Sequence, residues 1–366
     1  MVTIRVPITE QRDASYDIVV GRGLQAELPR LVRAACPAAR YAVISDSHVA
    51  ELYGGAVVRG LGPEAQLFAF PAGEWNKSRE TWAALSDRML AAQFGRDSAV
   101  VALGGGVVGD IAGFVAATYL RGVPYVQVPT SLLAMIDSSI GGKTGVDVPS
   151  GKNLLGAFHQ PRLVVADLDV LGTLPRSQLA AGMAEAVKHG VIADADYFAF
   201  LEGASGPLLA RDAAALERAV TRSVQIKSEV VAADEREAGR RAILNFGHTV
   251  GHALEAAAKY ALLHGEAVAI GMSCEAALAE SLAIAAPGTA ARVRALLEAF
   301  GLPLTRPPGS TVDELVRVMQ LDKKARDGVV RFSLPRAIGA MCGDPRAGWT
   351  VPAPVDAVRA ALGGAD

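Results

Sequence analysis

The stretch SAVVALGGGVVGDIAGFVAATYL, from Ser98 to Leu120, places an apolar run before a glycine loop and an apolar helical pattern after it. The run AVVAL is typical of a parallel strand that is buried on both faces. Asp110 divides the stretch into apolar pieces shorter than the roughly 20 residues of a membrane span. The stretch therefore predicts a strand, a tight turn and a helix inside an α/β domain.

The glycine loop satisfies the pattern GxGxxG with Gly104, Gly106 and Gly109. Glycines let the backbone approach a pyrophosphate, and the N-terminus of the following helix attracts anions, so the loop predicts a nucleotide site. Glycines that only pack a tight turn are the alternative. The usual acidic residue about 20 positions later is absent, because Val128-Pro129-Thr130 stands there. Three upstream charges are substitutes or else ordinary loop charges, namely Asp46, Glu74 and Lys77.

Short β-branched runs recur through the first half of the chain and alternate with longer amphipathic stretches. The expected strands are 41–45, 67–70, 99–103, 125–128 and 163–166. From about Pro175 onward alanine-rich helical patterns dominate, with expected helices at 213–232, 249–261, 267–285 and 290–300. The sequence therefore predicts an α/β domain with a parallel sheet over residues 1–174 and an all-α domain over residues 175–366.

The composition narrows the classes of function. The 36 basic and 38 acidic residues nearly cancel, leaving a formal net charge of −2, so neither nucleic acid nor an anionic membrane is an expected partner. Cys36, Cys274 and Cys342 have no CxxC spacing, which favours reduced thiols in a cytoplasmic protein. Arg5 and Glu10 fall where an export signal needs an apolar block, so we expect no export.

Three of the six histidines fall close together, as His248 and His252 in NFGHTVGH and His264 in LLHGE. His248 and His252 are spaced i,i+4 on one helical face, as in many metal pairs, and Glu185 is the obvious carboxylate partner. Spacing alone leaves open which two histidines bind metal, or whether all three only pack. His48, His159 and His189 stand singly and suggest no site.

Isolated cations stand in glycine-rich or apolar segments, where a lysine is costly unless it pairs or reaches solvent. Each alone is most simply a surface charge, but together they predict a pocket for phosphate and carboxylate groups. Neither GGK at Gly141 nor GKN at Gly151 follows a strand as GxxxxGK[ST], which argues against an ATP site. The isolated cations that predict the pocket are Arg121, Lys143, Lys152, Lys188, Lys227, Arg241, Lys323 and Lys324.

Seven segments in order resemble 3-dehydroquinate synthases, over about residues 40 to 340. They are GGGVVGD, QVPTSLLAMIDSSIGGKTGV, GKNLLGAFHQP, GMAEAVKHG, VVAADEREAGRRAILNFGHTVGHALE, LLHGEAVAIGM and LDKKARDG. The resemblance implies a Rossmann-like NAD-binding domain, a helical metal- and substrate-binding domain, and an active site in the cleft between them. It relates the chain to sugar phosphate cyclases and, in fold, to glycerol and iron-type alcohol dehydrogenases.

The same resemblance implies Glu185, His248 and His264 as metal ligands and His252 as a substrate contact, which replaces the pairing that spacing favours. The other residues implied around the substrate are Arg121, Asp137, Lys143, Lys152, Asn153, Lys188, Lys227, Arg241, Asn245 and either Lys323 or Lys324, of which Lys324 is our prediction. Those implied around the nucleotide are Asp46, Glu74, Lys77, Gly105, Gly106, Asp110, Thr130 and Ser131, together with Lys143 and Lys152. Asp137 borders both ligands.

By this resemblance the substrate is 3-deoxy-D-arabino-heptulosonate 7-phosphate and the products are 3-dehydroquinate and phosphate. NAD+ oxidises an alcohol transiently, phosphate is eliminated, the hydride returns, and an aldol step closes the ring, without net redox change. A divalent zinc or cobalt ion is implied, as is a homodimer. The sequence departs from the family at Asp147, His189 and Ser131, where asparagine, tyrosine and threonine are common, and none of these changes removes a chemical function.

Three other functions are compatible with parts of this pattern. Another sugar phosphate cyclase would act on a different sugar phosphate, although the retained cations favour a carboxylate-bearing substrate. A metal-dependent polyol dehydrogenase would release NADH and would not need so many cations. An inactive nucleotide-binding or scaffold protein is expected to have lost metal-ligand or lysine positions, and all are present.

Overall fold

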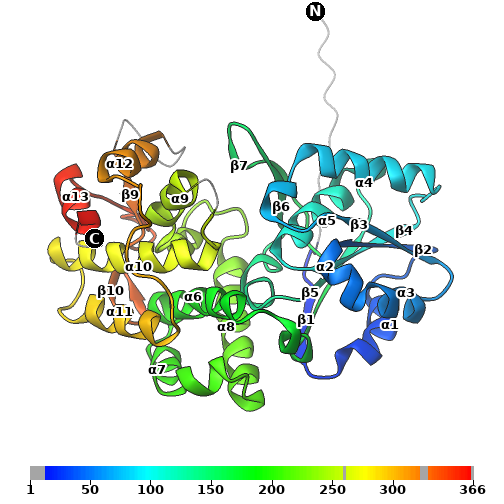
Figure 1. Ribbon diagram of the computed structural model, residues 1–366, viewed down its shortest axis with the longest axis horizontal. Coiled ribbons are helices and arrows are strands. Elements are labelled where there is room, and N and C mark those ends of the chain that lie inside the picture. The colour runs from blue at the N-terminus through cyan, green and yellow to red at the C-terminus, as the bar shows by residue number, and fades with distance from the viewer. Residues whose placement is uncertain (1–12, 259–260, 322–328, 364–366) are drawn as a thin grey trace, which may run out of the picture.

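The computed structural model describes residues 13–258, 261–321 and 329–363 (Figure 1). Its N-terminal half is built on one six-stranded parallel sheet. In spatial order the strands are β1 (Asp17–Gly21), β8 (Leu163–Asp167), β5 (Tyr125–Pro129), β4 (Ser98–Gly104), β2 (Arg40–Asp46) and β3 (Ala65–Phe70). The five strands predicted from apolar runs are confirmed, whereas the edge strand β1, whose residues are mostly half-buried, was not predicted.

Helices cover both faces of this sheet, because successive strand residues point to opposite sides. On one face Val43 and Val101 pack against Leu28 of α1 and Val57 of α3. On the other face the alternate strand residues, such as Val100, pack against α4 and α5. The bounds are α1 (Leu24–Ala35), α3 (Gly55–Leu61), α4 (Arg79–Ala91) and α5 (Gly106–Thr118). All seven residues of β4 are buried, as the continuous apolar run predicts.

A β-hairpin that the sequence analysis did not predict extends from the sheet domain. It pairs β6 (Lys143–Val148) with β7 (Gly151–Phe158) in antiparallel fashion. Gly113 of α5 lets β6 lie close, since a Cβ at Gly113 would be 2.4 Å from Thr144 Cγ2. The hairpin carries Lys143, Lys152 and Asn153, so it brings three predicted site residues toward the helical half (Figure 1).

The second half is mainly helical and contains all four expected helices, but the prediction of an all-α domain was wrong. Its helices are α6 (Arg176–Ala193), α7 (Ala195–Leu209), α8 (Ala213–Ala233), α9 (His248–Ala257), α10 (His264–Ser281), α11 (Thr289–Ala299), α12 (Val312–Leu321) and α13 (Val355–Gly363). It also holds four short strands in two antiparallel pairs, β9 (Arg331–Phe332) with β12 (Val351–Pro352) and β10 (Pro335–Ala337) with β11 (Ala340–Met341). Most of α6 and α10 is buried, so these two helices form the centre of the helical half.

Short helical turns connect the larger elements and carry several predicted site residues. They are α2 (Ser47–Val49), η1 (Ala50–Gly54), η2 (Glu74–Asn76), η3 (Tyr119–Arg121), η4 (Ala134–Ser138), η5 (Leu168–Thr173) and η6 (Arg240–Asn245). In Figure 1 the sheet domain and the helical half lie side by side, with α6 and α8 near their junction. Among the described residues, the structure contains no helix with the length and apolar character needed to traverse a bilayer.

Candidate active site

The glycine loop forms a tight turn from β4 into α5, as predicted. A Cβ on Gly104 would stand 2.4 Å from Val108 Cγ2, so the turn requires glycine there. Gly105 is the N-cap of α5, and no described side chain caps the first N–H groups of this helix. Those N–H groups and the positive end of the helix dipole fit a pyrophosphate. Gly106 stands beside Ser138, whose Oγ would lie 3.1 Å from a Cβ on Gly106.

Next to the loop, two predicted nucleotide residues form a buried ion pair. Lys77 Nζ lies 2.5 Å from Asp110 Oδ2, and their side chains are 6% and 19% exposed. Burial raises the pKa of Asp110, and Lys77 opposes this rise. The two opposite charges therefore neutralise each other, and their contact joins the N-terminal part of α5 to the end of η2.

The other predicted nucleotide residues occupy the same edge of the sheet. Asp46 ends β2 and its Oδ1 accepts hydrogen bonds from the backbone N–H groups of His48 and Val49, at 2.9 and 3.0 Å, which leaves Oδ2 for a ligand. Thr130 is buried, and its N–H donates to the Gly104 carbonyl at 2.9 Å. Ser131 Oγ accepts a hydrogen bond from the backbone N–H of residue 134. The structure thus gathers the loop, Asp46, Thr130 and Ser131 at the carboxyl end of the strands.

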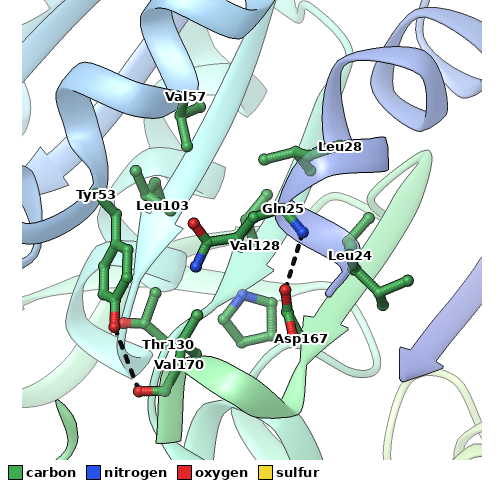
Figure 2. Close-up of a pocket in the computed structure, with 12 residues that line it drawn as sticks. Leu24, Gln25, Leu28, Tyr53, Val57, Leu103, Val128, Thr130, Asp167 and Val170 are labelled. Carbon is green, nitrogen blue, oxygen red and sulfur yellow. Dashed lines mark hydrogen bonds between the residues drawn. The ribbon is translucent and has the colours of Figure 1, made fainter. Parts of the chain in front are cut away.

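A small apolar pocket lies beside this edge (Figure 2). In Figure 2 Tyr53 stands at one side, where its hydroxyl donates to the Val170 carbonyl at 3.5 Å. On the other side the Gln25 N–H donates to Asp167 Oδ2 at 2.8 Å. Thr130 is the predicted site residue that lines this pocket, and the remaining lining residues include Leu28, Val57, Leu103 and Val128. The pocket suits an apolar or aromatic group more than a charged one.

The predicted metal ligands converge from three helices. Glu185 lies on α6, His248 opens α9 and His264 opens α10. Glu185 Oε1 faces both imidazoles, 3.6 Å from His248 Nε2 and 3.5 Å from His264 Nε2. One ligand atom from each residue lies within 4.8 Å of the others. Glu185 is fully buried, and its Oε1 accepts no hydrogen bond from the described residues.

This donor set fits a divalent cation, because two imidazole nitrogens and a carboxylate oxygen are a common zinc set with an open position. Burial disfavours the ionised form of Glu185, but Lys188 and the two histidines outweigh burial and hold the pKa of this carboxyl well below its usual range. Burial and Lys188 together depress the pKa of His248 far below its ordinary value. Glu185 is therefore ionised and His248 neutral at neutral pH. Burial lowers the pKa of His264, but Glu185 and Glu255 outweigh burial and raise it to about 10, so a metal ion would displace a proton from this ring.

His252 lies one helical turn after His248 and close to the cluster. Its ring centroid is 5.4 Å from that of His248 and 6.3 Å from that of His264. The i,i+4 spacing therefore brings His248 and His252 together, as predicted, but the Nε2 atoms that meet Glu185 belong to His248 and His264. This arrangement agrees with the ligand set that the resemblance implies.

Charged side chains from both halves of the chain surround the metal cluster. Asp137 of η4 accepts a 2.7 Å hydrogen bond from Lys227 of α8, and Lys188 forms an ion pair with Glu185. Burial raises the pKa of Asp137, but Lys227 and Lys188 outweigh it and keep the carboxyl ionised. The contact between η4 and α8 places this part of the site at the junction of the two halves.

A second set of contacts joins the hairpin to the segment before α9. Lys143 of β6 forms an ion pair with Glu237, and Asn245 donates from Nδ2 to the same carboxylate at 2.7 Å. Arg241 is 2% exposed and donates to the carbonyls of Glu235 and, at 3.3 Å, Gly141. Lys143, Arg241 and Asn245 are thus gathered as the resemblance implies.

Two predicted residues are not joined to these groups, and a third cannot be placed. Arg121 is exposed at the end of η3, and it makes no hydrogen bond or ion pair with the predicted site in the described parts of the chain. Asn153 is exposed on β7, and its backbone N–H donates to Asp147 Oδ1 at 2.7 Å. Lys324, like Lys323, lies outside the described residues. The bond from the Asn153 N–H to Asp147 links β7 to β6 across the hairpin turn.

Two glutamates belong to the site that the sequence analysis did not select. Glu237 contacts Lys143 and Asn245, and Glu255 lies within 3.0 Å of Lys152 Nζ and 3.4 Å of His264 Nδ1. Each stands three to four residues from a selected residue, Arg241 in one case and His252 in the other, and that proximity was the available signal. Glu255 lies in a predicted helix, and a glutamate there is usually a surface charge.

The chain is similar to known 3-dehydroquinate synthases along most of its length. Residues 67–181 match the family 3-dehydroquinate synthase N-terminal, and residues 182–325 match 3-dehydroquinate synthase C-terminal. The 3-dehydroquinate synthase of Symbiobacterium thermophilum is 54% identical over 331 residues, which cover 89% of this chain and 92% of that protein. The two families match in order and cover both halves of the chain.

Solved structures of two cyclising enzymes share the fold. The 2-epi-5-epi-valiolone synthase of Streptomyces hygroscopicus, with NAD+ and Zn2+ bound, superimposes with a TM-score of 0.88 at 33% identity, covering 98% of this chain and 99% of that one. A 2-deoxy-scyllo-inosose synthase complexed with carbaglucose-6-phosphate, NAD+ and Co2+ gives 0.88 at 27% identity, covering 95% and 96%. With both family regions matched and a relative more than half identical over most of its length, the chain belongs to the 3-dehydroquinate synthase family.

Proposed function

We propose that this protein is a 3-dehydroquinate synthase, a phosphate-eliminating lyase that converts 3-deoxy-D-arabino-heptulosonate 7-phosphate into 3-dehydroquinate and phosphate. The observation that carries the proposal is the convergence of Glu185, His248 and His264 beside a set of buried lysines, in a chain 54% identical to a protein of that name. A metal-dependent polyol dehydrogenase needs the metal and nucleotide sites, whereas an enzyme that binds an anionic sugar phosphate also needs the cations.

Two cofactors belong to this proposal. NAD+ would be held by the N–H groups after Gly105 and by the residues at the strand ends, and a zinc or cobalt ion by Glu185, His248 and His264. Bound there, NAD+ supplies a reversible hydride acceptor and the metal ion supplies a Lewis acid. Supporting this assignment, both similar cyclases named above were solved with NAD+ and a divalent ion.

The chain's own groups suit an anionic, polyhydroxylated substrate. Lys152 lies between Glu74 and Glu255, each 3.0 Å from its Nζ; burial lowers the pKa of this ammonium, but the two carboxylates outweigh burial and raise it. Lys152 therefore stays charged and can bind phosphate or carboxylate. Ionised Asp137 can accept hydrogen bonds from substrate hydroxyls. His252 and Asn245 are candidates to relay protons or bind near the leaving phosphate.

The remaining predicted site residues keep the roles that the family resemblance implies. The substrate would be contacted by Arg121, Lys143, Asn153, Lys188, Lys227, Arg241 and Lys324. Lys188 and Lys227 also form ion pairs, with Glu185 and Asp137 respectively. The sheet and hairpin supply some of these side chains and the helices supply the others. This division suits a site between domains 1–174 and 175–366. Such a cleft excludes water when the domains close on a substrate.

We also propose a cytoplasmic homodimer with no nucleic acid or membrane partner. Cys36 and Cys274 are buried free thiols, in keeping with a reducing compartment. Apolar side chains of β7, such as Leu154 and Phe158, are 44% and 43% exposed and offer surface to a second copy. Sedimentation velocity of the purified protein measures this directly, with a twofold mass expected.

The rival with specific support is another sugar phosphate cyclase, since a 2-epi-5-epi-valiolone synthase is 33% identical to this chain. The test incubates the purified protein with NAD+, Zn2+ or Co2+ and either the heptulosonate phosphate or other phosphorylated sugars, and identifies products by mass spectrometry. Formation of 3-dehydroquinate from the heptulosonate phosphate alone is the expected result. A cyclitol formed only from another sugar phosphate contradicts the proposal.

A further inference from the structure

The two imidazoles of the metal cluster are oriented in the same way but by different partners. Both turn Nε2 toward Glu185 Oε1, at 3.6 Å for His248 and 3.5 Å for His264. His248 Nδ1 lies 3.1 Å from the Phe246 carbonyl oxygen, whereas His264 Nδ1 lies 3.4 Å from Glu255 Oε1. In each ring, therefore, one nitrogen faces the ligand cluster and the other faces an acceptor.

An acceptor at Nδ1 fixes the tautomer of a histidine. It favours the proton on Nδ1, which leaves the Nε2 lone pair for a metal ion, and it also fixes the ring orientation. The partner of His248 is a backbone oxygen two residues away, so it moves with the ring. The partner of His264 is a side chain of another helix, α9, that packs against α10. Only the second arrangement can be removed by substitution.

Packing alone holds the two rings to different extents. The His248 side chain is 11% exposed, whereas that of His264 is 32% exposed and has room to rotate. Glu255 is only 3% exposed, and Lys152 Nζ lies 3.0 Å from its Oε1. Lys152 is in turn 3.0 Å from Glu74, so the carboxylate is held from the hairpin side as well. The Lys152 ammonium offsets part of the cost of burying this carboxylate and fixes the position of its Oε1.

We propose that Glu255 is a positioning residue that accepts from His264 Nδ1 and thereby holds Nε2 in the ligand geometry. This inference rests on the proposed metal site. Glu255 contacts the ligand and not the ion, so its removal weakens metal binding without abolishing it. Because Lys152 contacts the same oxygen, Glu255 also links the metal cluster to the hairpin.

The test measures zinc affinity of the full-length protein by competition with a chromogenic chelator. Glu255→Ala is expected to weaken zinc binding by about 10- to 100-fold, the usual effect of losing such a partner. Glu255→Gln keeps a neutral acceptor and is expected to weaken it less. Glu280→Gln is the matched control: this half-buried glutamate lies on α10 and caps the backbone N–H of residue 290, far from the cluster, and zinc affinity should match wild type.

The visible absorption spectrum of the cobalt-loaded variants supplies a second readout that a merely structural role would not change. The spectrum of Glu255→Gln should differ from wild type, because a neutral amide oxygen accepts more weakly from His264 Nδ1 and makes this imidazole a less basic ligand, while that of Glu280→Gln should not. Wild-type zinc affinity and a wild-type cobalt spectrum in a folded Glu255 variant would overturn the inference. If Glu255→Ala does not fold, the cobalt spectrum of Glu255→Gln decides.

The proposed metal site has its own control. His264→Ala removes a ligand and should lose tight zinc binding altogether. Failure of the wild-type protein to bind zinc, or full binding by His264→Ala, would contradict the ligand set of the proposed function. A wild-type protein that binds zinc, a His264→Ala variant that does not, and Glu255 variants that bind normally would contradict the role of Glu255 alone.

Discussion

The nucleotide edge of the sheet and the metal cluster of the helices both bring charges inside the molecule, but they compensate them differently. At the sheet edge Lys77 and Asp110 neutralise each other at 2.5 Å. In the cluster, Glu185 faces two imidazoles, and its Oε1 accepts no hydrogen bond from the described residues. The sheet edge therefore offers backbone N–H groups beside a neutralised pair. In the cluster, Lys188 pairs with one oxygen of Glu185, and the other oxygen and two ring nitrogens face one another, the arrangement that we propose holds a divalent cation.

The largest expected effect follows from breaking the metal cluster. Glu185→Gln removes the only carboxylate of the three-residue ligand set, and we expect kcat to fall by at least about a thousandfold, because a Lewis acid contributes several kcal/mol to the barrier. Steady-state kinetics with saturating NAD+ and metal measures this. Glu202→Gln, which breaks an exposed ion pair with Arg292, is the control and should leave kcat unchanged. Near-normal kcat in Glu185→Gln would place the chemistry elsewhere.

Breaking the compensated pair at the sheet edge should act on stability instead. Lys77→Met leaves the buried Asp110 carboxylate without its partner, which costs about 3–5 kcal/mol of unfolding free energy. The double variant Lys77→Met/Asp110→Leu replaces both charges and should recover most of the loss. Urea denaturation followed by circular dichroism measures both. A double variant as unstable as the single one would show that the pair does not act as a unit.

A smaller effect is expected at the turn that leads into α5. Gly104→Ala brings a Cβ to within 2.4 Å of Val108 Cγ2, and such overpacking costs about 1–3 kcal/mol. In a Val108→Ala background the same substitution should cost less, because the clashing methyl groups are gone. A double-mutant cycle from urea denaturation gives the coupling. Equal costs in both backgrounds would mean that the turn needs glycine for another reason.

The smallest expected effect is the pH dependence of stability that His189 causes in the helical half. His189 is fully buried near Asp137, and burial together with Lys188 lowers its pKa to about 3. The pKa of His189 is near 6.5 in the unfolded chain, so between about pH 6.5 and pH 3 the unfolded chain binds one more proton than the folded chain. As pH falls through this window, the residue therefore lowers the free energy of unfolding by about 1.4 kcal/mol per pH unit.

His189→Tyr removes this proton linkage and introduces the residue common in the family. Urea denaturation at pH 7 and pH 5 should show a smaller loss of stability in the variant than in wild type. His159→Tyr is a suitable comparison, because that histidine is only half-buried and its Nε2 lies 2.9 Å from the Val123 carbonyl oxygen. The same pH dependence in wild type and His189→Tyr would contradict a neutral, buried His189.

Much of the fold could be predicted because its signals are local. Apolar runs gave five of the six strands of the sheet, and the glycine loop gave its turn into α5. The hairpin of β6 and β7 was not predicted, because SSIGGKTG and SGKNLLG are rich in glycine and polar residues and lack the alternation of a strand. β6 also packs closely against α5 at Gly113, a contact between segments that local composition does not reveal.

The site could be predicted in part. Spacing drew attention to His248, His252 and His264, but only the three-dimensional packing of α6, α9 and α10 shows which ring nitrogens face Glu185. Glu255 escaped prediction because a glutamate in a helical pattern resembles solvated surface charge, and Glu237 because it stands in the turn that follows α8. Glu255 is buried and Glu237 half-buried, and their partners lie on α10 and the hairpin, which are distant in sequence.

We propose that the sheet edge and the metal cluster serve one redox-neutral cyclisation. The most direct test follows phosphate release from 3-deoxy-D-arabino-heptulosonate 7-phosphate and the NADH absorbance band in the same reaction. We predict that each enzyme molecule releases many molecules of phosphate while no NADH accumulates. Phosphate release should stop when either NAD+ or the metal ion is withheld. NADH that accumulates in step with substrate consumption, without phosphate release, would contradict the claim.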